Sequence, residues 1–312
     1  MTITQLQYVL AVAEHQNFTL AAEKSFVTQP TLSMQVQKLE EELDILIFDR
    51  SKKPIGITEV GAKIVAQAKS IINESNRIKD IVDQEKGFIG GEFTLGIIPT
   101  VMPTLLPMFL KTFINKYPKV NLIIKEKNTE NLIRNLQDGH LDAAIAATPL
   151  QIEFIKERPL YYEPFVGYVP ESHRLGRVNK LNPEDLDISD ILLLRDGHCF
   201  RENIINLCNA PKSFRDDHFQ LQSGSFETLV NLSNEGLGMT LLPFLNTMEL
   251  DDRKKKNLKS FENPSPAREV SLIYHKSELK IQITDALYDV ISSVVRGAIA
   301  FQDVKIISPL NR

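Results

Sequence analysis

The chain has 312 residues, of which 43% are hydrophobic and 24% are charged, and its net charge is −4. This length favours two or three domains, and the composition is that of an ordinary globular protein. No apolar run is long enough to span a bilayer, and the first residues lack the pattern of a signal peptide. We therefore expect a cytoplasmic protein with no membrane partner. Two cysteines are too few for a framework of structural disulfides.

The charge of the N-terminal region does not indicate a nucleic-acid partner. Residues 1–63 contain six Lys or Arg residues against eight Asp or Glu residues. A test based on basic charge therefore fails, and any argument for DNA binding depends on local geometry.

The spacing of apolar residues predicts short helices in the N-terminal region, over residues 3–15 and 20–24 and from residue 28 onward. Pro30 falls in the first turn of the third helix, where its missing N–H costs nothing. An inward stripe is expected at Leu32, Val36, Leu39 and Leu43. The opposite face is suited to base edges and phosphates and consists of Thr31, Met34, Gln37 and Lys38, with Ser33 at its edge.

Residues 50–58 predict a two-stranded wing with Lys52 and Lys53 at its tip. Periodicity alone leaves open a small helical bundle whose polar face meets water. A long helix is then expected from Thr58, as N-cap, to about Lys86. Its apolar residues recur every seven positions, which predicts a seam for a partner helix from a second copy or from the same chain. The seam consists of Ile64, Ile71 and Ile78, with Ala68, Ser75 and Val82 offset by four.

Four segments resemble the winged helix-turn-helix of LysR-type regulators: residues 17–24 (NFTLAAEK), 28–33 (TQPTLS), 38–43 (KLEEEL) and 46–50 (LIFDR). The resemblance implies a DNA-binding transcription regulator that reads paired half-sites in promoter DNA as a homodimer or homotetramer. Met34 departs from the family, which often has Arg there. The candidate DNA contacts are Gln29, Pro30, Thr31, Ser33, Met34, Gln37, Lys38, Lys52 and Lys53.

From residue 93 onward strands and helices alternate, which predicts a mostly parallel sheet covered on both faces. The expected strands cover residues 93–98, 120–125, 141–146 and 270–274, and the expected helices cover 101–116, 130–138 and 279–300. A second α/β set is expected within residues 165–267, including 191–194 and 236–243.

Residues 138–145 (DGHLDAAI) and 234–243 (NEGLGMTLLP) resemble the effector domain of LysR regulators, which implies an α/β fold like that of periplasmic binding proteins, with two lobes and a cleft. The expected domains are a winged helix-turn-helix (all-α with a small wing, 1–58), a linker and dimerisation helix (59–88), effector lobe I (89–164 and 268–302) and effector lobe II (165–267). Thr100 and Thr129 lie where strands give way to helices, the place where such sheets bind ligands, although each could be only an N-cap.

The two cysteines are expected at the two ends of one helix. Cys199 follows a turn at residues 196–197, and the helix start together with His198 and Arg201 creates a positive potential that favours a thiolate. Cys208 lies nine residues later, about 13.5 Å along an unbroken helix, whereas a disulfide needs Cα atoms within about 7 Å. The helix and the disulfide therefore exclude each other. A pair of inert buried thiols is the alternative.

This cysteine spacing, in a LysR-like chain, resembles that of peroxide-sensing members of the family. The resemblance implies that hydrogen peroxide oxidises Cys199 (peroxidatic) and that Cys208 (resolving) then forms the disulfide. It implies a peroxide pocket made of Thr100, Thr129, His198, His218 and Arg268. It also implies RNA polymerase as a partner, together with a thiol reductant such as glutaredoxin or thioredoxin, and neither a cofactor nor a metal.

Three other functions compete with this interpretation. A LysR-type regulator could respond to a small metabolite in the cleft between the lobes and leave its cysteines idle. A thiol peroxidase would use the same cysteines, but a helix-turn-helix has no role in such an enzyme, so we expect no enzymatic function. A metal sensor would use His198, Cys199 and Cys208, which lack the compact spacing of zinc ligands.

Overall fold

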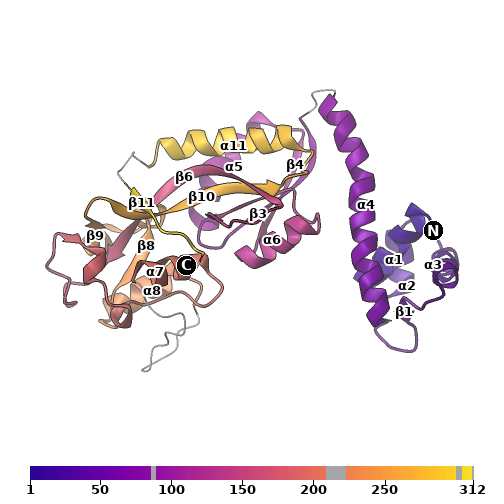
Figure 1. Cartoon of the computed structure of the whole chain (residues 1–312), viewed down its shortest axis with the longest axis horizontal. Coiled ribbons are helices and arrows are strands. Elements are labelled where there is room, and N and C mark those ends of the chain that lie inside the picture. The colour runs from indigo at the N-terminus through magenta and orange to yellow at the C-terminus, as the bar shows by residue number, and fades with distance from the viewer. Residues whose placement is uncertain (86–88, 209–222, 300–303, 311–312) are drawn as a thin grey trace. The chain divides into compact units, whose positions relative to one another are not determined.

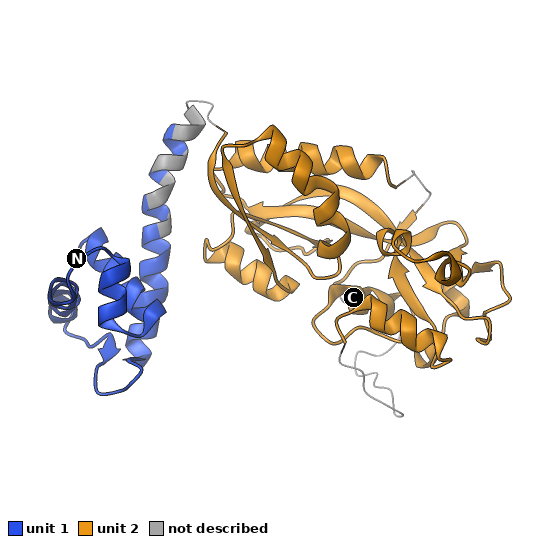
Figure 2. Ribbon diagram, turned by 180° about the vertical axis from the view of Figure 1, so that it is seen from behind, with its two compact units in different colours: residues 1–86 blue, residues 87–312 orange. Residues whose placement is uncertain are grey.

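The computed structural model describes residues 1–85, 89–208, 223–299 and 304–310. The chain forms two compact units, residues 1–86 and 87–312, which Figure 2 shows in different colours. Within the described ranges, no helix is long and apolar enough to cross a membrane.

The first unit is a helical cluster with a small two-stranded sheet. Its elements are α1 (Ile3–His15), α2 (Phe18–Lys24), α3 (Gln29–Leu43), β1 (Phe48–Asp49), β2 (Gly56–Ile57) and α4 (Glu59–Glu85). Strands β1 and β2 are antiparallel and form the expected wing. The inward stripe of α3 is confirmed at Leu32, Val36 and Leu39, which are fully buried. It is wrong at Leu43, which is 37% exposed because it lies in the last turn of the helix.

Helix α2 begins two residues earlier than the sequence predicted. Asn17 is its N-cap, and the side-chain oxygen accepts hydrogen bonds from the backbone N–H groups of Thr19 and Leu20 at 2.8 and 3.1 Å. A side-chain oxygen at this position satisfies N–H groups that have no partner within the helix. The cap therefore brings Phe18 into the first turn, where its side chain is buried in the core of the unit.

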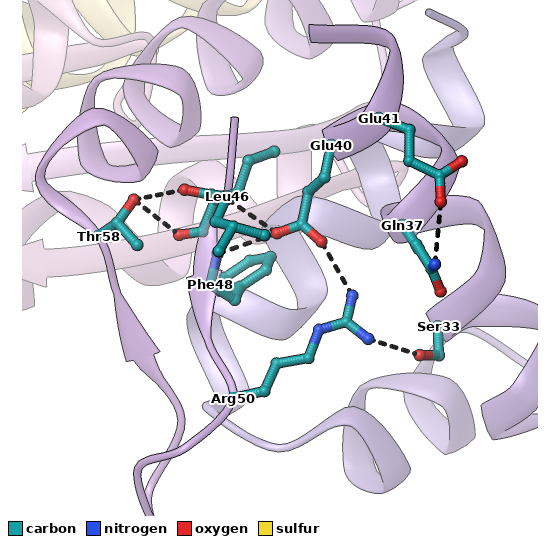
Figure 3. Close-up of polar contacts among 9 residues, drawn as sticks. Ser33, Gln37, Glu40, Glu41, Leu46, Phe48, Arg50 and Thr58 are labelled. Carbon is teal, nitrogen blue, oxygen red and sulfur yellow. Dashed lines mark hydrogen bonds and ion pairs between the residues drawn. The ribbon is translucent and has the colours of Figure 1, made fainter. Parts of the chain in front are cut away.

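A buried carboxylate joins α3 to the wing, as Figure 3 shows. Glu40 accepts hydrogen bonds from the backbone N–H groups of Ile47 and Phe48 at 2.8 and 3.1 Å. Its second oxygen pairs with the guanidinium of Arg50 at 2.9 Å. Because buried N–H groups need acceptors, this one side chain fixes the path from α3 into the wing.

Helix α4 has the N-cap that the sequence predicted, since the Thr58 hydroxyl accepts a hydrogen bond from Gly61 N–H at 2.9 Å. The first half of the predicted seam packs within its own unit, because Ile64, Ala68 and Ile71 join the core beneath α1. The second half is different. Ile78 is 64% exposed, and in the same part of the helix Ile81 and Val82 are exposed as well.

The second unit is built around a nine-stranded sheet (Figure 1). Its first part contains β3 (Gly91–Ile97), α5 (Met102–Lys116), β4 (Val120–Glu126), α6 (Thr129–Gln137), β5 (Ala143–Thr148) and β6 (Ile155–Tyr168). Its second part contains β7 (Lys180–Leu181), α7 (Cys199–Leu207), α8 (Phe226–Asn234), β8 (Thr240–Pro243), α9 (Phe244–Met248), α10 (Asp252–Lys255) and β9 (Leu258–Phe261). The remaining elements are β10 (Ser265–His275), α11 (Ile281–Arg296) and β11 (Val304–Ile306).

The sheet is mixed, so the expectation of a mostly parallel sheet is wrong. Strands run in the order β4-β3-β5-β10-β6-β9-β7. Strand β3 is parallel to β4 and β5, and the short strands β7 and β11 are parallel to β9 and β10. Strand β10 is antiparallel to β5 and β6, and β6 is antiparallel to β8 and β9. The reason is that β6 and β10 are long returning strands that cross from one half of the unit to the other, rather than strands joined by helical crossovers.

Two apolar cores divide the unit into lobes. Lobe I surrounds a core that includes Phe93, Leu95, Phe109 and Leu287, and lobe II surrounds a core that includes Phe165, Phe200, Leu229 and Leu241. The two-lobed α/β fold expected from the family resemblance is present. The expected strand over residues 191–194 is absent. That segment is buried, but its pairing is limited to a single bridge between Ile191 and Met239.

The network around Glu40 gives the first testable prediction. Replacing Glu40 with Ala leaves two buried N–H groups unsatisfied, and we expect the free energy of unfolding of the first unit to fall by roughly 2–3 kcal/mol. Chemical denaturation followed by circular dichroism measures this. Glu41→Ala is the matched control, because Glu41 is exposed and its carboxylate accepts a surface hydrogen bond from Gln37. Equal stability of the two variants would contradict the structural role of Glu40.

Candidate functional site

Helix α7 starts at the boundary between the two lobes. Its first residue, Cys199, is 8% exposed and lies in the core cluster of lobe I. The residues that follow on its buried face, Phe200, Ile204 and Ile205, lie in the core of lobe II. Both cysteines of the chain carry free thiols. The helix therefore places one sulfur atom against lobe I while the rest of its apolar face belongs to lobe II.

The start of α6 supplies a hydroxyl to this sulfur atom. The hydroxyl of Thr129, the first residue of α6, donates a hydrogen bond to the Cys199 Sγ at 3.5 Å. Asn128 caps the same helix through a hydrogen bond from Asn131 N–H at 3.0 Å. Gly197, with φ of +88°, turns the chain into α7, and a side chain there would approach the Asn128 amide at 3.7 Å. The N-termini of α6 and α7 therefore meet around one thiol, and N–H groups at helix N-termini favour negative charge.

A buried ion pair holds the second predicted threonine. The guanidinium of Arg268 donates to Glu163 from Nε and Nη2 at 2.9 and 2.7 Å. It also donates from Nη1 to the Thr100 hydroxyl at 2.9 Å and from Nη2 to the Thr100 carbonyl at 3.1 Å. Its face lies 5.3 Å from the centre of the Phe200 ring in α7. Because arginine can only donate, the Thr100 hydroxyl accepts here and keeps its own proton for another partner.

Arg268, which the family resemblance assigns to the peroxide pocket, is held by a buried ion pair. Its positive charge is paired with Glu163, and both side chains are only 1% exposed. Glu163 is further fixed by a hydrogen bond from Leu245 N–H at 2.9 Å. Strands β6 and β10 carry the two partners, so the pair lies where the two long strands cross between the lobes. Arg268 therefore contacts Thr100 and, on α7, the ring of Phe200.

His198 is buried beside Cys199 and is neutral at pH 7. Burial, and then the charge of Arg195, lowers the pKa of its imidazole below the ordinary value. The Arg195 Nε donates to His198 Nε2 at 3.3 Å, so the imidazole proton resides on Nδ1. Arg201 forms an ion pair with Asp196 at 2.9 Å. A neutral His198 adds no positive charge beside Cys199, so the start of α7 and Arg201 remain as the expected sources of positive potential.

Cys208 is the C-cap of α7, and its N–H donates to the Ile204 carbonyl at 3.0 Å. Burial raises the pKa of its thiol to about 12, and the nearby carboxylates of Asp190 and Asp187 add to the effect. This sulfur stays protonated at neutral pH, which makes it a poor nucleophile. The intact helix α7 lies between it and Cys199, so the Cα atoms of the two cysteines are about 13.5 Å apart along the axis.

The structure leaves most of the predicted DNA contacts accessible on one unit. Those that are exposed are Gln29, Pro30, Thr31, Met34, Gln37, Lys38, Lys52 and Lys53. Ser33 is half-buried, and its hydroxyl accepts a hydrogen bond from Arg50 at 3.2 Å, as Figure 3 shows. The Gln37 amide donates to Glu41 at 2.9 Å, and Lys52 pairs with Asp49 at 3.4 Å. Contact with DNA therefore requires Gln37 and Lys52 to exchange these surface partners, which costs little.

Most of the contacting residues described above were predicted from the sequence, but Glu163 and Arg50 were not. Thr129 and His198 lie beside Cys199, whereas Thr100 and Arg268 form a hydrogen-bonded pair linked to α7 through Phe200. His218 lies outside the described residues. Glu163 was missed because β6 also carries Lys156, Glu157 and Arg158, so the sequence of the strand does not mark Glu163 as buried. Arg50 was missed because it was assigned to the wing, although it also stacks on Phe18 at 4.8 Å.

Comparisons with known proteins are consistent across the chain. The family model for the bacterial regulatory helix-turn-helix protein of the lysR family matches residues 3–62, and the model for the LysR substrate binding domain matches residues 86–296. The DNA-binding transcriptional dual regulator OxyR of Escherichia coli K12 is 34% identical over 276 residues, 88% of this chain and 89% of that protein. The hydrogen peroxide-inducible genes activator of Haemophilus influenzae is 32% identical over 301 residues, 95% of this chain and 99% of that protein.

A solved structure resembles the whole chain. It is full-length OxyR from Pseudomonas aeruginosa with a cysteine-to-aspartate substitution. It is 33% identical in sequence, superposes with a TM-score of 0.75, and the alignment covers 94% of this chain and 98% of that one.

The burial of Cys208 gives a prediction about thiol reactivity. In a Cys199→Ser variant, we expect iodoacetamide to alkylate Cys208 at pH 8 at least about tenfold more slowly in the folded protein than in denaturant, because the thiolate is scarce and shielded. Mass spectrometry measures the rate. Cys199 alkylation in a Cys208→Ser variant is the control. Equal rates in folded and unfolded protein would contradict a buried, protonated Cys208.

The raised pKa of Cys208 also predicts how the stability of the folded chain changes with pH. The pKa of Cys208 is raised from 9.0 to about 12 in the folded helix. The stability that the protonated thiol contributes is therefore complete below pH 9.0 and is lost as the pH rises toward 12. Alkylation of Cys208 should accelerate over that range.

Proposed function

Because this chain belongs to the LysR family of bacterial regulators, we propose that it is a cytoplasmic, DNA-binding transcription regulator that senses hydrogen peroxide through Cys199 and Cys208. The observation that carries the proposal is the placement of the two thiols at opposite ends of helix α7. A disulfide between them cannot form while that helix exists. Relatives named as peroxide-inducible activators support peroxide as the signal and activation as the output.

The first chemical step takes place at Cys199. Its thiolate attacks one oxygen of hydrogen peroxide, the O–O bond breaks, and the products are a sulfenic acid on Cys199 and hydroxide. The leaving hydroxide needs a hydrogen-bond donor or a proton. We assign this role to the Thr100 hydroxyl, whose proton Arg268 leaves free by donating to its oxygen. The Thr129 hydroxyl, 3.5 Å from the sulfur, positions the thiolate, and His198 is a neutral donor through Nδ1.

The second step uses Cys208. Its sulfur attacks the sulfenic sulfur of Cys199, an S–S bond forms as the S–O bond breaks, and the hydroxyl group leaves as water with the thiol proton of Cys208. The sum of both steps is two thiols and one peroxide giving one disulfide and two waters. While α7 is folded the pKa of Cys208 stays near 12, so this step follows unwinding of the helix, which returns the thiol to water.

Packing and chain entropy both favour the reduced, helical state. Unwinding α7 exposes Phe200, Ile204 and Ile205, each of which contributes about 1.5–3 kcal/mol while buried. Closing a loop of about ten residues in the unwound segment costs a further ~2.7 kcal/mol of chain entropy. The segment therefore adopts the oxidised fold only when the oxidation of the two thiols by peroxide supplies this free energy.

We assign a separate role to each domain. We assign promoter binding to residues 1–58 and pairing of two copies to residues 59–88, where Ile78, Ile81 and Val82 are exposed on α4. Residues 89–164 with 268–302 and residues 165–267 form the sensing lobes. Refolding of α7 between the lobes would alter how a homodimer or homotetramer presents its DNA-binding units, and with it the contact to RNA polymerase. A thiol reductant such as glutaredoxin or thioredoxin would restore the reduced state.

Replacing Cys199 tests the sensor directly. We expect Cys199→Ser to fold and bind promoter DNA, but to show no change in DNA footprint or transcription after one equivalent of hydrogen peroxide, because no sulfenic acid can form. Cys208→Ser is the matched variant, which should form a sulfenic acid and stop there. A peroxide response retained by Cys199→Ser would eliminate the assignment of Cys199 and favour a regulator that responds to a metabolite in the cleft.

The wing is tested by salt dependence. Replacing Lys52 and Lys53 with Ala should weaken binding to all DNA sequences, and the slope of log K against log salt should fall by about one for each phosphate that the variant no longer binds. Lys111→Ala together with Lys116→Ala makes the same charge change on the exposed face of α5 and should leave the slope unchanged. An unaltered slope in the wing variant would remove Lys52 and Lys53 from the interface.

A further inference from the structure

The C-terminal tail of the described chain lies across the sensor helix. Strand β11 pairs with β10 in parallel from Ser265 to Ala267, next to the buried Arg268 (Figure 1). The Ile307 N–H then donates to the Ala267 carbonyl at 2.8 Å, and its side chain packs against the core of lobe II. Pro309 is buried in turn. We call residues 304–310 the strap.

Two asparagines of α7 hold the strap. The Asn203 side-chain amide donates to the Ile307 carbonyl at 2.6 Å. The Asn206 amide donates to the Ser308 carbonyl at 2.9 Å and to the Leu310 carbonyl at 3.3 Å. Residues three apart on a helix lie on the same face, so both amides point toward the strap only while α7 is coiled. Asn203 is fully buried, which makes the loss of its partner costly.

We propose that Asn203 and Asn206 are positioning residues that bind the strap to α7 and so set how readily Cys199 and Cys208 form their disulfide. The contacts exist in the reduced, helical state. Unwinding the segment between the cysteines moves both amides away from the strap carbonyls, so the strap stabilises the reduced state and opposes oxidation. This inference rests on the proposed function, since it concerns the same redox step.

The substitution Asn206→Ala tests the strap because helix propensity and loss of the strap contacts change the stability of α7 in opposite directions. Alanine is a better helix former than asparagine, so without the strap this substitution would stabilise α7 and disfavour the disulfide. With the strap, loss of two hydrogen bonds destabilises the reduced state. We expect the equilibrium constant for disulfide formation, measured against glutathione with the full chain, to become three- to tenfold more favourable. A tenfold change corresponds to a reduction potential about 30 mV more negative.

A truncation completes a double-mutant cycle. A chain that ends at Ile307 lacks the carbonyls that Asn206 contacts but keeps β11 and the partner of Asn203. In this background Asn206→Ala should show only its effect on helix propensity, and the disulfide should become slightly less favourable. Asn135→Ala in α6 is the matched control, because its half-buried amide donates within its own helix to Asn131. It should leave the potential unchanged.

Release of the strap gives a second readout. Lys305 lies in the strap and is exposed, so trypsin can cut after it once β11 leaves β10. We expect the peptide 306–312 to appear faster from peroxide-treated than from reduced protein, and peroxide to have no effect in Cys199→Ser. Mass spectrometry measures both.

The possible results separate the two proposals. If peroxide forms no disulfide in the unmodified chain, the proposed function fails. If the disulfide forms but Asn206→Ala shifts the potential in the positive direction, or not at all, in the full-length chain, the strap proposal is overturned while the sensor stands. A negative shift that persists unchanged in the truncated chain would also overturn it, because the shift would then not depend on the strap.

Discussion

Residues 199–208 can form either helix α7 or a loop closed by a disulfide between Cys199 and Cys208, but not both. Helix α7 holds the two sulfurs at its opposite ends, and a disulfide requires their Cα atoms within about 7 Å. Several other features of the site depend on which of the two is present. The high pKa of Cys208 belongs to the helical state, as do the burial of Phe200 in lobe II and the amide hydrogen bonds to the strap. A reaction at one sulfur atom can therefore change packing throughout the lobe, since all of these interactions end when the helix unwinds.

The lobes are connected where this change takes place. Strands β6 and β10 run through both lobes, and the buried pair of Glu163 and Arg268 sits on them. Breaking a buried ion pair leaves an uncompensated charge, so this junction is expected to stay rigid while α7 refolds. The rigid junction holds Thr100 through Arg268 and also carries β11, which starts the strap. Thr100, which we assign to the peroxide reaction, and β11, which begins the strap, are therefore both held by the junction of β6 and β10.

Local patterns predicted local structure well. The three-and-four spacing of Leu32, Val36 and Leu39 is enough to define the buried face of α3, and Gly197 marks the turn before α7. Leu43 failed because periodicity does not show where a helix leaves the core. Glu163 and Arg268 are 105 residues apart, and Glu40 looks like a surface residue, so their burial depends on tertiary packing that no local pattern contains. The strap was not predicted either, because a short extended segment that binds through its backbone carbonyls has no side-chain pattern.

Hydrogen exchange of the amides in residues 199–208, compared between reduced and peroxide-oxidised protein, addresses the competition between helix and disulfide most directly. The amide of Cys208, which is bonded to the Ile204 carbonyl in α7, is the most informative probe. Protection that is present in the reduced protein and lost once the disulfide has formed is the predicted result. A disulfide-bonded protein in which these amides remain as protected as before would contradict the idea that oxidation unwinds the helix.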